Sequence, residues 1–298
     1  MTGDEQSTNT TATRVLLFVG GDPEFALPTD SDRPLLDASG GAEAGGAVLV
    51  VAADSGLDRA LVLGVSVDHV VGDMDSVSPR ALEAAVRSGA IVHRHEADKD
   101  ATDLELALDL AVELTQTVTG GRIPGIHVVG GGGGRLDHLL GDVMLLAAPR
   151  LAAFTVTARF GPARLAVVRP DLPTTFDGSP GTVVSLLPIH GEAYGVTTTG
   201  LRWALTDGDL AAGTTRAVSN EMIGGPATVS LRAGTLAVVL PGTGTGRRNG
   251  IAPRTGPYDP APRLVPEGGE PTGEPTQQPS RAGALHDEAD VNPEPEEK

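Results

Sequence analysis

The chain has 298 residues, a formal net charge of −17 and no cysteine. This negative charge argues against binding to duplex nucleic acid or to an anionic membrane, because both need clustered Lys and Arg. The absence of cysteine excludes disulfides and thiolate metal sites. The polar N-terminal residues lack the apolar core of a signal peptide, and no apolar run is long enough to span a membrane. We therefore expect a cytoplasmic protein.

The first half of the chain alternates between two kinds of segment. Residues 1–13 lack apolar periodicity and are expected to form a disordered arm. Apolar runs closed by Gly, Pro or Asp predict strands, and the segments between them predict helices. The strands are expected within 14–23, 47–56, 68–76, 90–95 and 125–135, and the helices within 56–64, 79–88, 100–114 and 136–148. Strands that alternate with helices predict a Rossmann-like parallel sheet, here over residues 14–150.

Two of the predicted helices carry start signals. Ser78 followed by Pro79 is typical of an N-cap and first helical residue. Thr102 with Glu105 three residues later has the spacing of a capping box. Residues 28–46 give no clear assignment.

The pattern changes near residue 150. Short β-type runs punctuated by Gly and Pro predict an all-β domain over 151–242, either a sandwich or a barrel-like fold. The runs lie at 154–160, 164–170, 181–188, 194–201, 215–220, 227–232 and 235–240. From Ile251 onward the chain contains ten prolines, ten acidic residues and four basic residues. That composition cannot bury a core, so residues 243–298 are expected to form a disordered tail.

Four polar segments stand out in the first domain. They are ADSG (53–56), GDMDS (72–76), DKDATD (98–103) and GGGGGRLDH (130–138). Each follows a predicted strand, directly or after a short link, and precedes a helix. Because such loops meet outside the carboxyl ends of a parallel sheet, we expect them to face one ligand-binding crevice.

The acidic segments suggest a metal site. Asp73 and Asp75 repel each other unless a cation lies between them. Mg²⁺ commonly takes one or two carboxylates together with substrate phosphates, although a pair of Asp can also simply cap a turn. Asp103 is expected in the first turn of a helix, where a negative charge interacts favourably with the helix dipole. However, Asp98 and Asp100 make three Asp in six residues, which suggests a third metal ligand nearby.

The glycine run predicts a phosphate site. Gly130–Gly134 would let backbone N–H groups approach a phosphate at the start of the following helix. The run matches neither a Walker A loop nor the G-x-G-x-x-G fingerprint. Arg135 is suited to clamp a phosphate. Asp137 and His138 either contact the ligand or hold Arg135 and the helix start.

The order of these segments, followed by GVTTTGLRWAL (195–205) and SNE (219–221), resembles the thiamine pyrophosphokinase (thiamine diphosphokinase) family. The resemblance covers residues 14–241. It implies a homodimer with an α/β nucleotide domain and a β-sandwich that binds thiamine. It also implies Mg²⁺-dependent transfer of pyrophosphate from ATP to the hydroxyl of thiamine, with release of AMP.

The resemblance assigns roles by motif. Asp73, Asp75 and Asp103 are expected to hold Mg²⁺, and with Arg135 they form the expected catalytic set. The expected ATP site consists of Asp54, Ser55, Gly56, Thr102, Gly133, Gly134, Arg135, Asp137 and His138. Trp203 and Ser219 are expected to contact thiamine across the dimer. Two residues depart from the family pattern, since Ser55 replaces a frequent Gly and Asp142 stands where Asn is expected.

Two other functions remain open on the sequence. A metal-dependent glycosyltransferase also uses D-x-D to hold a nucleotide diphosphate, but gives no reason for the segments at 195–205 and 219–221. The other is a non-catalytic nucleotide-binding module descended from the kinase. Loss of the carboxylates would support this hypothesis, but the carboxylates are present.

Overall fold

The structure is a computed structural model that describes residues 12–21, 47–96, 98, 100–115, 125–132 and 135–242. Most of the predicted N-terminal arm, the unassigned stretch 28–46 and the whole predicted tail 243–298 lie outside these residues. Among the described helices, none is long and apolar enough to cross a membrane.

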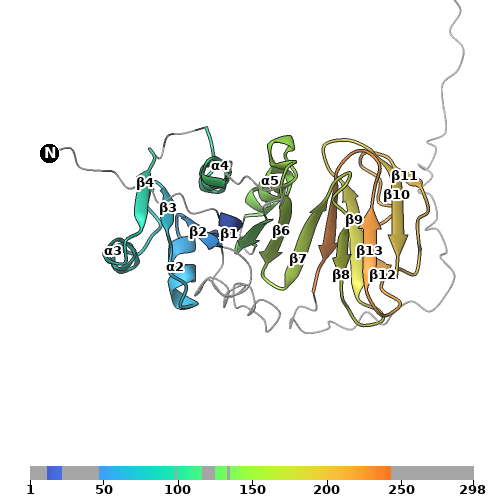
Figure 1. Cartoon of the computed structure of the whole chain (residues 1–298), viewed down its shortest axis with the longest axis horizontal. Helices are drawn as coiled ribbons and strands as arrows, with labels where there is room; N and C mark the ends of the chain where they lie inside the picture. The colour runs from blue at the N-terminus through green and yellow to red at the C-terminus, as the bar shows by residue number, and fades with distance from the viewer. Residues whose placement is uncertain are drawn as a thin grey trace, which may run out of the picture. The chain divides into compact units, whose positions relative to one another are not determined.

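One ten-stranded sheet runs through the described chain, in the order β12-β9-β14-β7-β6-β5-β1-β2-β3-β4 (Figure 1). Six neighbouring strands are parallel: β1 (Ala12–Phe18), β2 (Ala47–Ala53), β3 (His69–Gly72), β4 (Ile91–Arg94), β5 (Gly125–Val129) and β6 (Thr155–Phe160). The others pair antiparallel: β7 (Ala163–Val168), β9 (Val183–Pro188), β12 (Asn220–Glu221) and β14 (Leu236–Leu240).

Helices cover both faces of the parallel part. On one face lie α4 (Asp103–Thr115) and α5 (Leu136–Leu146), and on the other α2 (Gly56–Val62) and α3 (Pro79–Arg87) (Figure 1). Strand β1 shows why both faces need a cover. The side chains of Val15 and Leu17 pack in the hydrophobic core between the sheet and α4. Those of Leu16 and Phe18 pack in the core on the opposite face, between the sheet and α2. A strand buried on both faces reads as a continuous apolar run.

A second sheet packs against the antiparallel strands. Its order is β11 (Gly208–Leu210), β10 (Ala193–Thr199), β13 (Ala227–Ser230) and β8 (Thr174–Phe176). The core between the two sheets is built from Val, Leu and Ala together with Met222. The predicted α/β fold followed by a β-sandwich is therefore confirmed.

The two parts share a sheet instead of meeting at a linker. Strand β6 pairs parallel with β5 and antiparallel with β7, so hydrogen bonding continues past residue 150. A short 3₁₀ helix, η3 (Pro149–Leu151), lies at that point. The division of the chain into domains at 150/151 stays a prediction.

The helix-start predictions are confirmed in part. The Ala81 N–H donates to Ser78 Oγ at 3.3 Å, which is the predicted N-cap. The Glu105 N–H likewise donates to Thr102 Oγ1 at 3.2 Å. The Glu105 carboxylate, however, accepts from Arg150 at 2.9 Å, so it does not close the capping box.

The predicted strand at 215–220 is wrong. Residues 216–219 form a turn, and only Asn220–Glu221 becomes a strand. Ser219 has φ +60°, a left-handed conformation that interrupts an extended strand. The sequence also gave no sign of β8 and β11, which have three residues each and are too short for an alternating pattern to appear.

Candidate active site

The loops that follow four parallel strands meet at one edge of the sheet. The Asp54 N–H, just after β2, donates to the carbonyl of Val71 in β3 at 2.8 Å. The Gly131 N–H, after β5, donates to the carbonyl of Gly20, after β1, at 2.6 Å. The carboxyl ends of β1, β2, β3 and β5 are thus tied together, where a doubly wound sheet binds its ligand.

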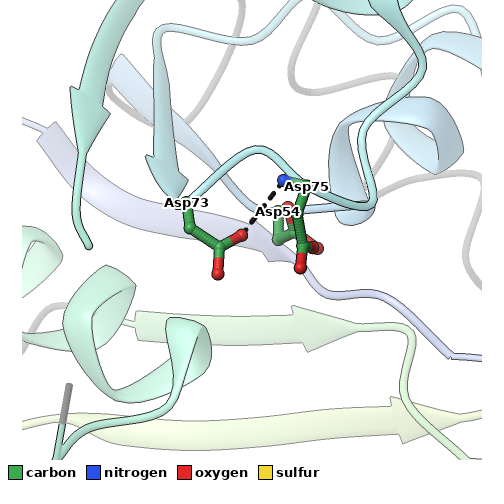
Figure 2. Close-up of side chains that lie close together, drawn as sticks. All are labelled: Asp54, Asp73 and Asp75. Atoms are coloured by element: carbon green, nitrogen blue, oxygen red, sulfur yellow. Dashed lines mark hydrogen bonds between the residues drawn. The ribbon is translucent and has the colours of Figure 1, made fainter. Parts of the chain in front are cut away.

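Three carboxylates converge at this edge (Figure 2). One oxygen each from Asp54, Asp73 and Asp75 can be chosen so that all lie within 4.8 Å of one another. Within the loop, the Asp75 N–H donates to Asp73 Oδ1 at 3.0 Å. Ser76 Oγ donates to Asp75 Oδ1 at 2.7 Å. These bonds hold the two loop carboxylates towards Asp54.

The backbone of the cluster is in unusual conformations. Asp54 has φ +44° and Met74, between the paired carboxylates, has φ +68°. Non-glycine residues in this region cost roughly 1–3 kcal/mol each and persist where the surroundings impose them. Gly72 has φ +144°, and a Cβ there would lie 3.0 Å from Asp103 Oδ1 and 3.2 Å from Asp54 Cβ. Because glycine has no Cβ, the end of β3 can lie close to the side chains of both Asp54 and Asp103.

Asp103 lies beside this cluster and is not one of its three converging members. Its carboxylate contacts the Gly72 position from the first turn of α4. The predicted metal set was Asp73, Asp75 and Asp103, with Asp54 assigned to the nucleotide. The structure instead brings Asp54 together with Asp73 and Asp75, and places Asp103 at their border.

The electrostatics of Asp54 suit a cation. Burial raises the pKa of Asp54 above its ordinary value, and the charges of Asp103, Asp73 and Asp75 raise it further, against a backbone hydrogen bond from Ser55 that lowers it. Asp54 Oδ1 is buried and has no hydrogen-bond partner among the described residues. An unpartnered buried carboxylate oxygen beside other carboxylates matches the hard oxygen ligands that Mg²⁺ prefers.

The predicted phosphate clamp lies at the start of α5. Arg135 is exposed and binds Asp137 through Nε at 3.2 Å and Nη2 at 2.5 Å. This hydrogen bond lowers the pKa of Asp137 to about 2. His138 is exposed one turn before Asp142. The predicted residues Gly133 and Gly134 lie outside the described part of the chain.

A cleft of about 490 Å³ adjoins the acidic cluster, a volume in the usual range for small-molecule sites. Its lining includes Gly21, Ser55, Arg59, Asp75 and Ser78. The buried Arg59 guanidinium donates to the carbonyls of Gly20 and Gly21, both at 3.4 Å, and so supports the loop after β1.

Other predicted nucleotide residues have local roles. Gly56 begins α2, and a Cβ there would lie 2.2 Å from the Phe18 carbonyl oxygen, so this helix packs directly on β1. Ser55 Oγ lies only 2.4 Å from where a Cβ on Gly20 would be. The departure at Ser55 is therefore accommodated by a glycine opposite. Thr102 Oγ1 caps α4 through Glu105.

The two predicted thiamine residues lie in the sandwich. Trp203 is 55 % exposed, so it is not part of the buried core. The Arg202 guanidinium carbon lies 4.9 Å from the centroid of its ring. Ser219 is exposed, and its N–H donates to Ser185 Oγ at 3.0 Å.

Three residues shape this site in ways that the sequence did not reveal. Asp54 was assigned to the nucleotide, and its place in the carboxylate cluster was not expected, although its position directly after a strand could have indicated it. Asp58 accepts from the Ser78 N–H at 3.0 Å and thereby joins α2 to the loop before α3, and nothing in its motif signals this. Asn220 is 5 % exposed and binds the backbone of Trp203.

Comparisons with known proteins cover both the α/β part and the sandwich. Residues 44–157 match the family model "Thiamin pyrophosphokinase, catalytic domain", and residues 172–236 match "Thiamin pyrophosphokinase, vitamin B1 binding domain". The thiamine pyrophosphokinase of Bacillus subtilis is 26 % identical over 191 residues, which are 64 % of this chain and 86 % of that protein.

Solved structures have the same fold. The Geobacillus thermodenitrificans thiamin pyrophosphokinase structure has a TM-score of 0.57 at 29 % identity and covers 78 % of this chain and 99 % of its own. The Bacillus subtilis structure has a TM-score of 0.60 at 23 % identity, with 76 % and 98 % covered. Because two models of one family match the α/β part and the sandwich in the right order, the chain belongs to the thiamin pyrophosphokinase family.

Proposed function

We propose that the chain transfers pyrophosphate from ATP to the hydroxyl of thiamine, giving thiamine diphosphate and AMP. The observation that carries this proposal is the convergence of Asp54, Asp73 and Asp75 at the carboxyl edge of the sheet in a chain of this family. Phosphoryl-type transfer depends mainly on positioning and on neutralising charge. An acidic protein that binds a polyphosphate needs a cation to do both.

We place a divalent cation, magnesium by preference, on Asp54, Asp73 and Asp75, with Asp103 beside them. The buried Oδ1 of Asp54 and the raised pKa of this carboxyl support the assignment. When bound, the cation supplies positive charge to the polyphosphate. The cleft that reaches Ser55 and Asp75 is the proposed site of ATP.

The chain's own groups complete the proposed mechanism. Arg135, which is exposed at the start of α5, is positioned to exchange its contact with Asp137 for a phosphate oxygen. In the glycine run, the N–H groups of Gly130 and Gly131 already donate to the carbonyls of Arg159 and Gly20, so among the described glycines the proposed further donor near this helix start is Gly132. A carboxylate of the acidic site accepts the proton of the thiamine hydroxyl as it attacks the β-phosphorus.

The proposed thiamine site uses Trp203 and Ser219 of the partner in a homodimer. An exposed apolar ridge supports an interface: Leu136, Leu140 and Met144 are 67 %, 55 % and 53 % exposed at successive turns of α5. Residues four apart lie on one helix face. The ridge follows Arg135 directly, so an interface there would lie next to the proposed phosphate site.

The competing functions fit less well. A glycosyltransferase would use a nucleotide sugar, and the second family model, which covers residues 172–236, argues against it. A non-catalytic module gives no reason for a buried carboxylate oxygen aimed at two other carboxylates.

The decisive experiment incubates the purified chain with thiamine, ATP and Mg²⁺ and resolves AMP from ADP. Formation of AMP with thiamine diphosphate is expected. Formation of ADP with thiamine monophosphate would show ordinary kinase chemistry instead. Mn²⁺ titration followed by electron paramagnetic resonance tests the metal site separately, because Asp54→Asn should weaken Mn²⁺ binding whether or not turnover is observed.

The shared site can be tested by mixing two variants. The Asp75→Asn and Trp203→Ala proteins are mixed in equal amounts and allowed to exchange subunits. Half of the dimers are then mixed, and each mixed dimer has one intact site of two, made from the unaltered Asp75 of one subunit and the unaltered Trp203 of the other. At low thiamine the mixture should therefore regain about a quarter of the wild-type activity. A monomer in light scattering, or no regain after exchange, would contradict a site built from two subunits.

A further inference from the structure

The segment that carries Trp203 is held by a second segment that runs antiparallel to it. The Ile223 N–H donates to the Gly200 carbonyl at 3.0 Å, and the Arg202 N–H donates to the Glu221 carbonyl at 2.8 Å. An isolated β-bridge joins Leu201 to Met222 between these bonds. The two segments therefore form a short ladder that ends just before Trp203.

The backbone cannot continue this ladder to Trp203. Ser219, two residues before Glu221 in the second segment, has φ +60°, and its N–H turns away to Ser185 Oγ at 3.0 Å. The Trp203 N–H and carbonyl need another partner, because an unpaired backbone group at a partly buried position is costly.

The side chain of Asn220 supplies that partner. Its Oδ1 accepts from the Trp203 N–H at 3.1 Å, and its Nδ2 donates to the Trp203 carbonyl at 2.8 Å. Oδ1 also accepts from the Glu221 N–H at 2.8 Å. Asn220 is 5 % exposed, and its backbone pairs with Val184 in the sheet. The backbone that carries the amide side chain is therefore held in place.

The indole is fixed from a second direction by Arg202. The guanidinium carbon lies 4.9 Å from the ring centroid, and Arg202 Nη1 binds Glu221 Oε2 at 3.0 Å. Glu221 is the residue after Asn220, so one short segment anchors both the backbone of Trp203 and the cation on its ring. The indole remains 55 % exposed even with this cation over one face.

We propose that Asn220 is a positioning residue that acts like a strand backbone and presents the Trp203 indole to a planar ligand. The ligand's identity as thiamine rests on the proposed function, whereas the positioning of the indole does not. At neutral pH the amide of Asn220 offers both the donor and the acceptor that this geometry needs. An aspartate would set a carboxylate against the Trp203 carbonyl, and an alanine would leave both backbone groups unpaired.

The test exploits the fact that Trp203 is the only tryptophan in the chain. Asn220→Ala and Asn220→Asp are compared with wild type by fluorescence anisotropy and acrylamide quenching, without ligands. Asp209→Ala is the matched control, because it removes one side-chain bond to a backbone N–H, that of Gly195 at 3.0 Å, elsewhere in the sandwich. Both Asn220 variants should lower the anisotropy and raise the quenching, and the control should change neither.

A second readout separates positioning from general loss of structure. The Asn220→Ala variant should raise the KM for thiamine by about three- to ten-fold while kcat and the KM for ATP stay within about two-fold. Asn220→Asp should recover wild-type quenching at low pH, because a neutral carboxyl can again donate to the Trp203 carbonyl. The aspartate variant keeps the size of the side chain and so serves if the alanine variant does not fold.

Wild-type fluorescence in both Asn220 variants would overturn the proposal, as would a quenching change in Asn220→Asp that acid does not reverse. A wild-type protein that forms no AMP with thiamine would overturn the proposed function alone, since the fluorescence measurements use no ligand.

Discussion

Replacing Asp142 with asparagine should stabilise the protein at neutral pH. Asp142 lies on α5 and is only partly exposed, and a Cβ placed on Gly131 would lie 3.5 Å from its Oδ2. Burial raises the pKa of this carboxyl from 3.8 to about 6, although the nearby His138 opposes the rise. Between these two pH values the native state holds a proton that the unfolded chain has lost. Stability therefore falls as the pH rises through this window, and asparagine removes that loss.

The size of the effect follows from the pKa. A rise from 3.8 to about 6 corresponds to at most about 3 kcal/mol of unfolding free energy at pH 7. Because the carboxyl is partly exposed, solvent screening reduces this to about 1–2 kcal/mol. For a chain of this size we expect the melting temperature of Asp142→Asn to rise by about 3–6 °C at pH 7. At pH 4 the two proteins should differ much less.

Urea unfolding at pH 4 and pH 7, without nucleotide or metal, measures this difference directly. Glu83→Gln is the matched control, because it removes one negative charge from an exposed position of α3. An equal change at both pH values, or a loss of stability at pH 7, would refute the reasoning. If the glycine run binds phosphate, the same variant should also lower the KM for ATP by about two- to five-fold above pH 7, since one negative charge near the polyphosphate is gone.

Three other predictions concern the proposed site and the end of the chain. Asp75→Asn should abolish thiamine-dependent AMP formation and leave the melting temperature equal or higher, because it relieves repulsion in the acidic cluster; normal turnover at saturating Mg²⁺ would exclude the role. Trp203→Ala should raise the KM for thiamine about three- to thirty-fold with a smaller effect on turnover, because the indole loses its cation–π contact with the cationic ring of thiamine. The prediction would be contradicted if the variant unfolds and the fluorescence of the wild-type protein does not respond to thiamine. Deleting residues 251–298 should leave AMP formation nearly unchanged, since the family models end at residue 236; a large drop in melting temperature would show a wrong boundary.

The parts of the fold that the sequence revealed are those with long local patterns. The strand–helix alternation before residue 150 and the caps at Ser78 and Thr102 depend on neighbouring residues, so they can be read without tertiary contacts. The turn at 216–219 could not be read in this way. Its sequence is β-type, but burial of Ala217 and the positive φ of Ser219 override that preference.

The site was predictable in its location but only partly in its membership. Loop residues after parallel strands had to gather at one edge, and Asp73 and Asp75 do so. Whether Asp54 or Asp103 completes the cluster depends on two features that spacing does not encode. These are the positive φ of Asp54 and the close approach that Gly72 permits. The amide of Asn220 was missed for the same reason, since it acts on a residue seventeen positions away.

The place of β14 in the sheet has a consequence for how the chain is made. This strand is the last described element in sequence, yet it lies between β7 and β9 in the sandwich half of the sheet. During synthesis from the N-terminus, β7 and β9 emerge first and have edges that face each other without a strand between them. Such exposed apolar edges are prone to pair with other chains. We therefore expect nascent chains that stop before Leu236 to aggregate or to recruit chaperones. The parallel strands β1 to β5, whose neighbours are all complete by Phe160, can by then already be protected from hydrogen exchange.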